Sequence, residues 1–181
     1  MTQAKSLLSY VISDVLSKGK SLEVAFYIVN NELCKDNKES LFLTLFVSIL
    51  DLQTGEMKCC NAAHNPPLLT VGNGDFEFLD CKQNFILGGV KDVTYETTTL
   101  YLKPGTRFIF YTDGITESNN ADYELFGEER LLQLVNELSH SCNSMKDAAE
   151  ALFHEVEEYA EGIQQADDIT FLFVYNNGPS C

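Results

Sequence analysis

Two segments far apart in the chain decide the fold: RFIFYTDG, residues 107–114, and DDITFLFVY, residues 167–175. Each joins a run of β-branched and aromatic residues, which favour strands, to aspartate at one end. Asp113 directly follows the first run, whereas Asp167 and Asp168 directly precede the second. If the two strands are antiparallel neighbours, the end of one lies beside the start of the other. The pattern therefore predicts that Asp113 and one of the aspartate pair meet at one edge of a sheet.

A cluster of this kind is a candidate metal site. Carboxylates held together repel one another and lose hydration, so they favour a bound cation. Hard oxygen ligands with no His or Cys nearby in sequence suit Mg²⁺ or Mn²⁺. Asp-Gly and Asp-Asp are also common turn residues at strand ends, so the residues alone leave a plain turn as the alternative.

The composition predicts one folded domain. The 181 residues are 45% apolar, which is enough for a substantial core. No stretch approaches the roughly 20 apolar residues needed to cross a bilayer. The N-terminus lacks the basic start and apolar segment of a signal peptide. The six cysteines include no Cys-x-x-Cys pair, which disfavours a zinc site and fits reduced thiols. We therefore expect a cytoplasmic protein.

The formal charge is −15, and most of it lies in one segment. Between Asp113 and Asp168 there are fifteen acidic residues, and the only cations are Arg130 and Lys146. Such a charge argues against binding to nucleic acid or to an anionic membrane, both of which need clustered Lys and Arg. A solvated helical surface explains most of these charges, and a few of them remain candidates for metal ligands.

Hydrophobic spacing predicts helices near both ends of the chain and strands between them. Apolar residues recur at three- and four-residue intervals in 4–16, in about 21–34, in 126–138 and in 148–159. An antiparallel meander with short turns is expected for the strands, and a closing strand follows the last helix. The meander segments are 41–50, 56–61, 68–72, 75–80, 95–102 and 107–112, and the closing strand is 169–175. This order predicts an α+β layered domain.

The run FIFYTDGITES, followed by YELFGEERL and ADDITFLFV, resembles the SpoIIE/RsbU-type branch of the metal-dependent protein serine/threonine phosphatases, the PPM or protein phosphatase 2C-like family. LFLTLFVSILDLQTGEM followed by NAAHNPPLL is similar to another stretch of that branch, in the same order. The resemblance covers nearly all of the chain after the first helix. It implies an α-β-β-α sandwich of two antiparallel sheets flanked by helices, with metals at one sheet edge. Ala63 stands where the family usually has glycine, which implies a slightly altered turn.

The resemblance also implies roles for individual residues. Asp113 and Asp167 match the family's metal-binding aspartates and would be the catalytic pair, with Asp168 the third metal candidate behind them. Gly114 would let the backbone turn tightly beside the site, and Glu117 would orient a water or a neighbouring loop. The implied cofactors are two Mn²⁺ or Mg²⁺ ions that supply a hydroxide for in-line attack on phosphoserine or phosphothreonine, so that no protein nucleophile is needed.

One part of the family pattern is absent from the sequence. The family has an N-terminal aspartate motif, preceded by a strand pair, whose aspartate bridges both metals. Ser13 to Lys20 imitates it with a spacing that is off by one residue, and Asp14 lies inside a predicted helix. We therefore expect residues 1–181 to be a single phosphatase domain that lacks its N-terminal strands and starts inside the first long helix. Such a chain would bind one metal loosely, because fewer carboxylates hold the cation.

Two functions of different classes follow. The first is a protein serine/threonine phosphatase that acts on a phosphorylated regulator, within this branch often an anti-anti-sigma factor of the STAS type in a bacterial partner-switching pathway. The alternative is a noncatalytic phosphatase-like module that binds a regulatory partner. A calcium-binding protein is disfavoured because the alternating oxygen-ligand loop of an EF-hand is missing. The apolar stripe on the N-terminal helices also suggests a homodimer.

Two loops have a structural and a functional interpretation. His64 could position substrate, although a histidine that ties down the following proline turn is the preferred interpretation. Gly88 and Gly89 could approach a phosphate with their amides, although a turn between strands is preferred.

Overall fold

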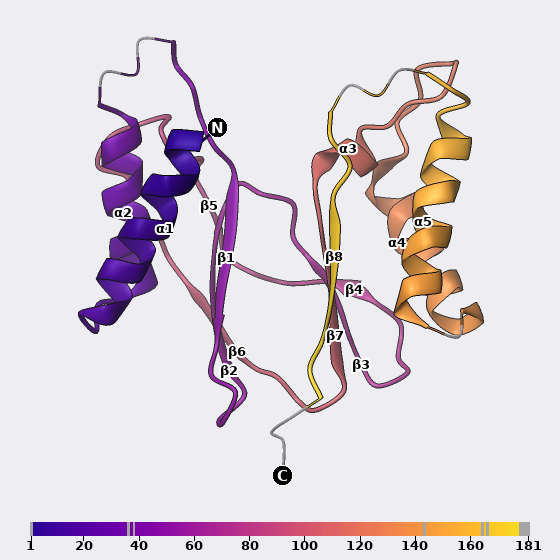
Figure 1. Cartoon of the computed structure of the whole chain (residues 1–181), viewed down its shortest axis with the longest axis horizontal. Helices are drawn as coiled ribbons and strands as arrows, with labels where there is room; N and C mark the ends of the chain where they lie inside the picture. Colours follow the sequence, from indigo (N-terminus) through magenta and orange to yellow (C-terminus); the bar gives the residue numbers. More distant parts are fainter. Residues whose placement is uncertain are drawn as a thin grey trace. The chain divides into compact units, whose positions relative to one another are not determined.

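The computed structural model describes residues 2–35, 37, 39–142, 144–163, 165 and 167–177 (Figure 1). The chain divides into two units, each built from two separate stretches of sequence. The first unit comprises Met1–His64 with Asp80–Tyr101, and the second comprises Asn65–Leu79 with Leu102–Cys181. Each unit has its own sheet and its own helices, and each is described by itself.

The first unit begins with two helices, α1 (Thr2–Ser17) and α2 (Leu22–Leu33), which lie side by side (Figure 1). Both predicted helices are confirmed. Gly19, with a φ of +68°, lies between them in the left-handed conformation that glycine adopts without strain. Asp14 lies within α1 and forms an ion pair of 2.7 Å with Lys18, four residues later. In the segment Ser13 to Lys20, which imitates the family's aspartate motif, Asp14 is therefore paired with a neighbouring lysine at the end of the helix.

The sheet of the first unit is built around β2 (Glu56–Ala62). β1 (Leu45–Leu50) and β6 (Thr98–Tyr101) are antiparallel to β2, whereas β5 (Gln83–Asn84) is parallel to it. The predicted meander is therefore wrong here, because β6 crosses back to β2 instead of pairing with its neighbour in sequence. The first strand is also shorter than predicted, since Leu43 makes only an isolated bridge to Leu87.

Apolar side chains of both helices pack on this sheet and form the first core. Phe26, Ala25 and Val29 of α2 are at most 1% exposed, and they cluster with Cys60 and Ala62 of β2. Burial of side chains of this size contributes about 1.5–3 kcal/mol each relative to exposure. The apolar stripe read from the sequence is thus largely used within the unit.

The sheet of the second unit has the order β4-β3-β7-β8 and is antiparallel throughout. Its strands are β3 (Leu68–Val71), β4 (Glu77–Phe78), β7 (Thr106–Tyr111) and β8 (Phe171–Tyr175). The hairpin predicted around Asn73-Gly74 joins β3 to β4. β8, the last strand, pairs with β7 from Arg107↔Tyr175 to Tyr111↔Phe171, which confirms the predicted antiparallel neighbours.

Two long helices cover one face of this sheet: α4 (Gly127–Ser141) and α5 (Met145–Tyr159). Both were predicted, whereas the four-residue α3 (Asp113–Thr116) was not. The second core comprises Leu131 and Val135 of α4, Leu152 and Val156 of α5, and the sheet residues Leu68, Ile109 and Tyr111. Two sheets with packed helices confirm the α+β class. In the described part of the chain no helix is long and apolar enough to cross a membrane.

Candidate functional site

The end of β7 and the start of β8 bring the predicted acidic residues to one edge of the second unit's sheet. The ladder continues one step past Tyr111↔Phe171, because the Thr112 amide donates to the Thr170 carbonyl at 3.0 Å. Asp113 is the next residue on one side, and Asp168 lies two positions before Thr170 on the other. The two acidic loops are therefore held as neighbours by backbone pairing.

The Thr112 side chain links the same two loops. Its hydroxyl donates to the Asp168 carbonyl at 2.9 Å and accepts from the Thr170 amide at 3.0 Å. One hydroxyl thus satisfies a donor and an acceptor of the segment that carries Asp168. Thr112 thereby ties the end of β7 to the segment that precedes β8.

Gly114 brings the backbones of the two loops into direct contact. A Cβ built on Gly114 would lie 2.6 Å from the Asp168 carbonyl oxygen and 3.2 Å from that of Asp167. Side-chain carbons do not approach oxygen this closely, so only glycine fits. Gly114 lies in α3 and has no positive φ, so glycine is required here by this close approach.

Asp113 is the first residue of α3 and is partly buried. Its carbonyl accepts from the Glu117 amide at 2.7 Å and from the Thr116 hydroxyl at 3.2 Å, which fixes its backbone. The Ser118 hydroxyl, buried beneath, donates to the Gly114 carbonyl at 2.8 Å. Glu117 ends this turn and is exposed. The helix therefore presents Asp113 from a firmly bonded turn.

Asp167 and Asp168 lie in the exposed segment that leads into β8. The Asp167 Oδ1 atom accepts from the Asp168 amide at 2.7 Å, and the Asp167 carbonyl accepts from the Gln165 side chain. Both carboxylates are therefore in contact with solvent, where a soluble cation can reach them.

The donor set fits a hard divalent cation. The backbones of two loops that carry aspartates lie together at one edge, and the Gly114 contact leaves no room between them for a side chain. Mg²⁺ is commonly held by one or two carboxylates, with water and substrate phosphate completing its shell. Within the described ranges, however, no group of three or more His, Cys, Asp or Glu residues could hold a metal. A cation held at this edge would therefore need water or another ligand to complete its coordination shell.

A buried tyrosine lies directly behind the site. Tyr111, the last residue of β7, is 3% exposed, and this burial raises the pKa of its phenol to about 12, with Glu128 adding to the shift. Tyr111 is therefore neutral at physiological pH and belongs to the core beneath Asp113.

The loop at His64 is tied down by hydrogen bonds, in line with the preferred interpretation. His64 Nδ1 lies 3.1 Å from the Thr44 hydroxyl, and the buried Asn61 side chain bonds both the amide and the carbonyl of His64 at 2.8 and 2.9 Å. Ala63 has a φ of +53°. The family's usual glycine would adopt this conformation without strain, whereas alanine does so at an energetic cost.

The Gly88-Gly89 loop is also structural. The Asn30 side chain, which is 0% exposed, accepts from the Gly88 amide and donates to the Val90 carbonyl, both at 2.8 Å. Sequence reasoning missed Asn30. The available signal was its place four residues after Phe26 on an otherwise apolar helix face, where a polar residue needs a buried partner.

Cysteines of the first unit form a second group of titratable residues. The Cys59 thiol donates a hydrogen bond to Cys81 and lowers the pKa of Cys81 to about 7, assisted by the Asn61 amide at 3.8 Å. The same contact and burial raise the pKa of Cys59, and burial raises that of Cys60 to about 12. The five cysteines that the structure describes are free thiols, as predicted.

Comparison with known proteins identifies the family. A family model for "Stage II sporulation protein E (SpoIIE)" matches residues 3–176. The chain is 28% identical over 138 residues to protein IcfG of Synechocystis sp. (strain ATCC 27184 / PCC 6803 / Kazusa), covering 76% of this chain and 21% of IcfG. It is 21% identical over 168 residues to the phosphoserine phosphatase RsbU of Bacillus subtilis (strain 168), covering 92% of this chain and 49% of RsbU.

The solved structures agree in fold. The SiaA-PP2C domain of Pseudomonas aeruginosa superimposes with a TM-score of 0.74 at 19% identity, covering 95% of this chain and 67% of that one. The chain spans about a fifth of IcfG and about half of RsbU. The fold is that of a PP2C domain, and because the family model matches almost the whole length of the chain, the chain belongs to the SpoIIE family.

Proposed function

We propose that residues 1–181 form a single domain of a metal-dependent protein phosphatase, which hydrolyses phosphoserine or phosphothreonine in a regulatory protein. The observation that carries this proposal is the backbone contact of Gly114 with Asp167 and Asp168. It holds together the two acidic loops on which the family's chemistry depends, although they lie more than fifty residues apart in sequence.

Asp113 and Asp167 are the proposed metal ligands and catalytic residues, with Asp168 as the third metal candidate. A divalent Mn²⁺ or Mg²⁺ ion bound there polarises the phosphoryl group and lowers the pKa of a coordinated water, which makes hydroxide available near neutral pH. Thr112 and Gly114 hold the two loops in register, and Glu117 orients a water or the neighbouring loop from its exposed position beside Asp113.

The charge of the domain makes substrate binding depend on the cation. Phosphoserine is a dianion, and it would approach an edge that carries three aspartates on a chain of net charge −15. Like charges at this range repel, so the phosphate binds only where a cation compensates them. Metal binding and substrate binding are therefore expected to be coupled.

The proposed substrate is a phosphorylated anti-anti-sigma regulator of the STAS type, dephosphorylated in the cytoplasm. Support comes from the family and from the similarity to RsbU, a phosphoserine phosphatase by name. A phosphorylated protein loop also suits an open, exposed edge better than a closed pocket would, because the Asp167 and Asp168 side chains are solvent-exposed.

Calorimetric titration with Mn²⁺, together with turnover of a phosphoserine peptide from such a regulator, tests the proposal. Asp113→Asn and Asp167→Asn are each expected to weaken Mn²⁺ binding and to abolish metal-dependent turnover. Asp122→Asn, at an exposed aspartate of the following loop, is the matched control and should leave both unchanged. Mn²⁺ binding that survives both substitutions would overturn the assignment of the site.

A noncatalytic module that binds a regulatory partner is the second candidate. The observation that favours it is the shortage of donors, since no three-residue metal group occurs in the described residues. The same experiment separates the two functions. A chain that binds the phosphorylated regulator equally well with Mn²⁺ and with EDTA, and releases no phosphate in either, would be the binding module.

A further inference from the structure

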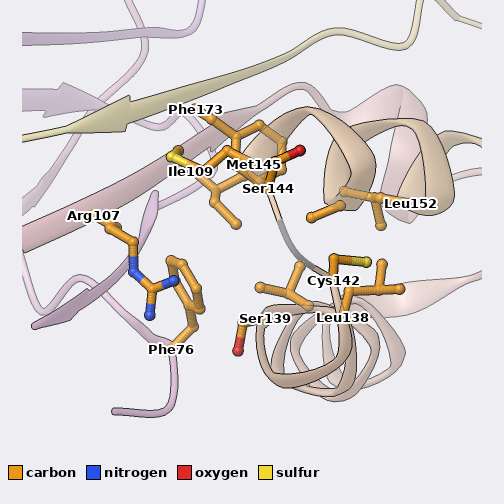
Figure 2. A pocket seen from close by; sticks show the side chains of 12 residues that line it. Phe76, Arg107, Ile109, Leu138, Ser139, Cys142, Ser144, Met145, Leu152 and Phe173 are labelled. Carbon is orange, nitrogen blue, oxygen red and sulfur yellow. The ribbon is translucent and has the colours of Figure 1, made fainter. Parts of the chain in front are cut away.

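A cavity unrelated to the acidic edge lies in the second unit, between the sheet and the two long helices (Figure 2). Its volume is about 170 Å³. The walls are mainly apolar and come from four elements: Ile109 of β7, Phe173 of β8, Val135 and Leu138 of α4, and Leu152 of α5. The cavity is partly open to solvent, so a small molecule can enter it from outside.

One cation lines this apolar cavity. Arg107 lies on the same face of β7 as the buried Ile109, and Figure 2 shows its side chain next to Phe76 at one side of the cavity. Its Nη2 donates to the Gly72 carbonyl at 2.7 Å, and the guanidinium lies 5.3 Å from the Phe76 ring centroid. The Nε atom is buried and has no hydrogen-bond partner.

Arg107 also lacks a compensating charge. The ion pairs found among the described residues do not include it, although the chain carries 27 acidic residues. An arginine keeps its charge in any protein environment and offers five N–H donors. Beyond the Nη2 bond to Gly72, the guanidinium has further N–H donors on its two terminal nitrogens, which a bound anion can accept.

The first turn of α5 adds positive potential on another side of the cavity. Ser144 and Met145 line the cavity, and Ser144 is the N-cap residue that accepts from the Asp147 amide at 3.1 Å. The other first-turn amides have no acceptor within the helix, and they carry the positive end of its dipole. Asp147 is exposed and is not part of the cavity wall, so it does not fill the anion's place.

We propose that this cavity binds a small organic monocarboxylate with an apolar body, aromatic or short alkyl. The carboxylate pairs with Arg107, and the body fills the space lined by Ile109, Leu152 and Phe173. The size agrees, because an apolar cavity of about 150 Å³ is known to accommodate benzene. A phosphate dianion is disfavoured, because the walls carry one positively charged side chain, Arg107, and are otherwise mainly apolar.

The wall that carries Phe76 is held in place before any ligand binds. The Asn136 side chain of α4 accepts from the Phe76 amide at 2.6 Å and donates to the Phe76 carbonyl at 3.2 Å. His140, one turn later, lies 2.8 Å from the Asp75 carboxylate. The hairpin loop is thus fixed to α4, which lowers the ordering cost of binding.

Methionine methyl groups provide a direct test with the whole chain. The sequence has three methionines: Met1, Met145 in the cavity wall, and Met57 in the core of the first unit. In protein labelled with [¹³C-methyl]methionine, titration with benzoate is expected to shift the Met145 resonance saturably and leave Met57 unchanged. Acetate, which lacks the apolar body, should shift neither, and benzyl alcohol should bind Met145's site about tenfold more weakly because it lacks the charge.

Two variants and a control complete the experiment. Arg107→Met keeps an apolar stem over Phe76 and should weaken benzoate binding about tenfold, to the level of benzyl alcohol. Ala148→Phe should fill the cavity and abolish the Met145 shift. Arg130→Met is the matched control, because Arg130 stacks on Tyr159 at 4.2 Å outside the cavity. The proposal would be overturned if the Met145 resonance did not shift at the solubility limit of benzoate. It would also be overturned if wild type and Arg107→Met bound benzoate with equal affinity. The Arg107→Met comparison does not depend on whether Ala148→Phe folds.

Discussion

Each unit has a loop with a glycine that is fixed by hydrogen bonds from one polar side chain: Gly88 in the first unit and Gly114 in the second. The two polar side chains differ in type and in how deeply they are buried. In the first unit the Asn30 side chain, fully buried, binds the Gly88 amide and the Val90 carbonyl at 2.8 Å. In the second unit the Thr112 hydroxyl, which is partly exposed, binds the backbone on the β8 side of the acidic edge.

The difference in burial suits different roles. The Gly88 loop contributes to stability, whereas the acidic loops keep their carboxylates accessible to solvent. A buried amide that satisfies two backbone groups in a low-dielectric core rigidifies its surroundings and is costly to lose. A hydroxyl at the solvent-exposed edge contributes less, and local opening there is cheaper. The acidic loops thus stay in register while their carboxylates remain open to solvent.

Gly114→Ala is expected to have the largest effect in the second unit. Its Cβ would lie 2.6 Å from the Asp168 carbonyl oxygen, so the two acidic loops must separate. Overpacking of this kind costs about 1–3 kcal/mol of unfolding free energy, and a misplacement of about 1 Å in a catalytic site costs roughly a hundredfold in rate. Urea unfolding and Mn²⁺-dependent phosphopeptide turnover measure both.

Gly74→Ala is the matched control for this substitution. Gly74 lies in the β3–β4 hairpin without a positive φ, and its added Cβ would make contacts of 3.4 Å, which are ordinary. Stability and turnover as good in Gly114→Ala as in Gly74→Ala would show that the close approach has no functional role.

Asn30→Ala should have the largest effect on the first unit. Two buried backbone groups lose their partners, and each unsatisfied group costs about 1–3 kcal/mol. We therefore expect the free energy of unfolding in urea to fall by about 2–6 kcal/mol. Asn31→Ala is the control, because Asn31 makes comparable bonds of 3.0 Å to Tyr27 and Asp92 in an exposed setting. Equal losses in the two variants would contradict the role assigned to burial.

Thr112→Val tests the hydrogen bonds that the Thr112 hydroxyl makes to the segment before β8. Valine keeps the shape and removes the hydroxyl, so we expect a loss of about 1 kcal/mol. The Thr170 amide donates to that hydroxyl, so its hydrogen exchange, followed by NMR, should accelerate. Thr112→Ser retains the hydroxyl and should leave the exchange rate near the wild-type value; acceleration in both variants would assign the effect to packing.

Ala63→Gly should give the smallest effect and the opposite sign. Ala63 has a φ of +53°, and relief of the left-handed strain of about 1–2 kcal/mol outweighs the extra chain entropy of glycine, about 0.5–1 kcal/mol. The melting temperature should rise slightly. Ala62→Gly, one residue earlier in β2, should lower it, because Ala62 is fully buried in extended backbone. A fall in both variants would show that the turn at residue 63 is not strained.

The acidic edge could be predicted because its signals are local. The predicted strands 107–112 and 169–175 adjoin Asp113 and Asp168 in sequence and so indicate a β7–β8 pair. The pair occurs as expected, with β8 beginning two residues later, at Phe171. The steric reason for Gly114 could not be predicted in the same way, since the atom that excludes a side chain is a carbonyl oxygen of a residue far along the chain.

The sheet connections of the first unit were beyond the sequence pattern for a different reason. β5 is two residues long, Gln83–Asn84, and pairs in parallel with β2, so it has neither alternation nor a hairpin turn. α3 is a single turn, too short for a helical period. Asn30 and Arg107 each make polar contacts in mainly apolar surroundings, one in each unit. The sequence shows that such a residue is polar, but it does not show which residue it will contact.

The interleaving of the units sets the order in which a ribosome can deliver the parts of the acidic edge. β7 leaves the exit tunnel with Thr112 and Gly114 behind it, yet its partner β8 is translated more than fifty residues later, after both long helices. Until Phe171–Tyr175 has emerged, β7 has a bare edge, and Asp113 has no second loop to meet. Closing so long a loop is slow, so within residues 1–181 the two acidic loops come together late in folding.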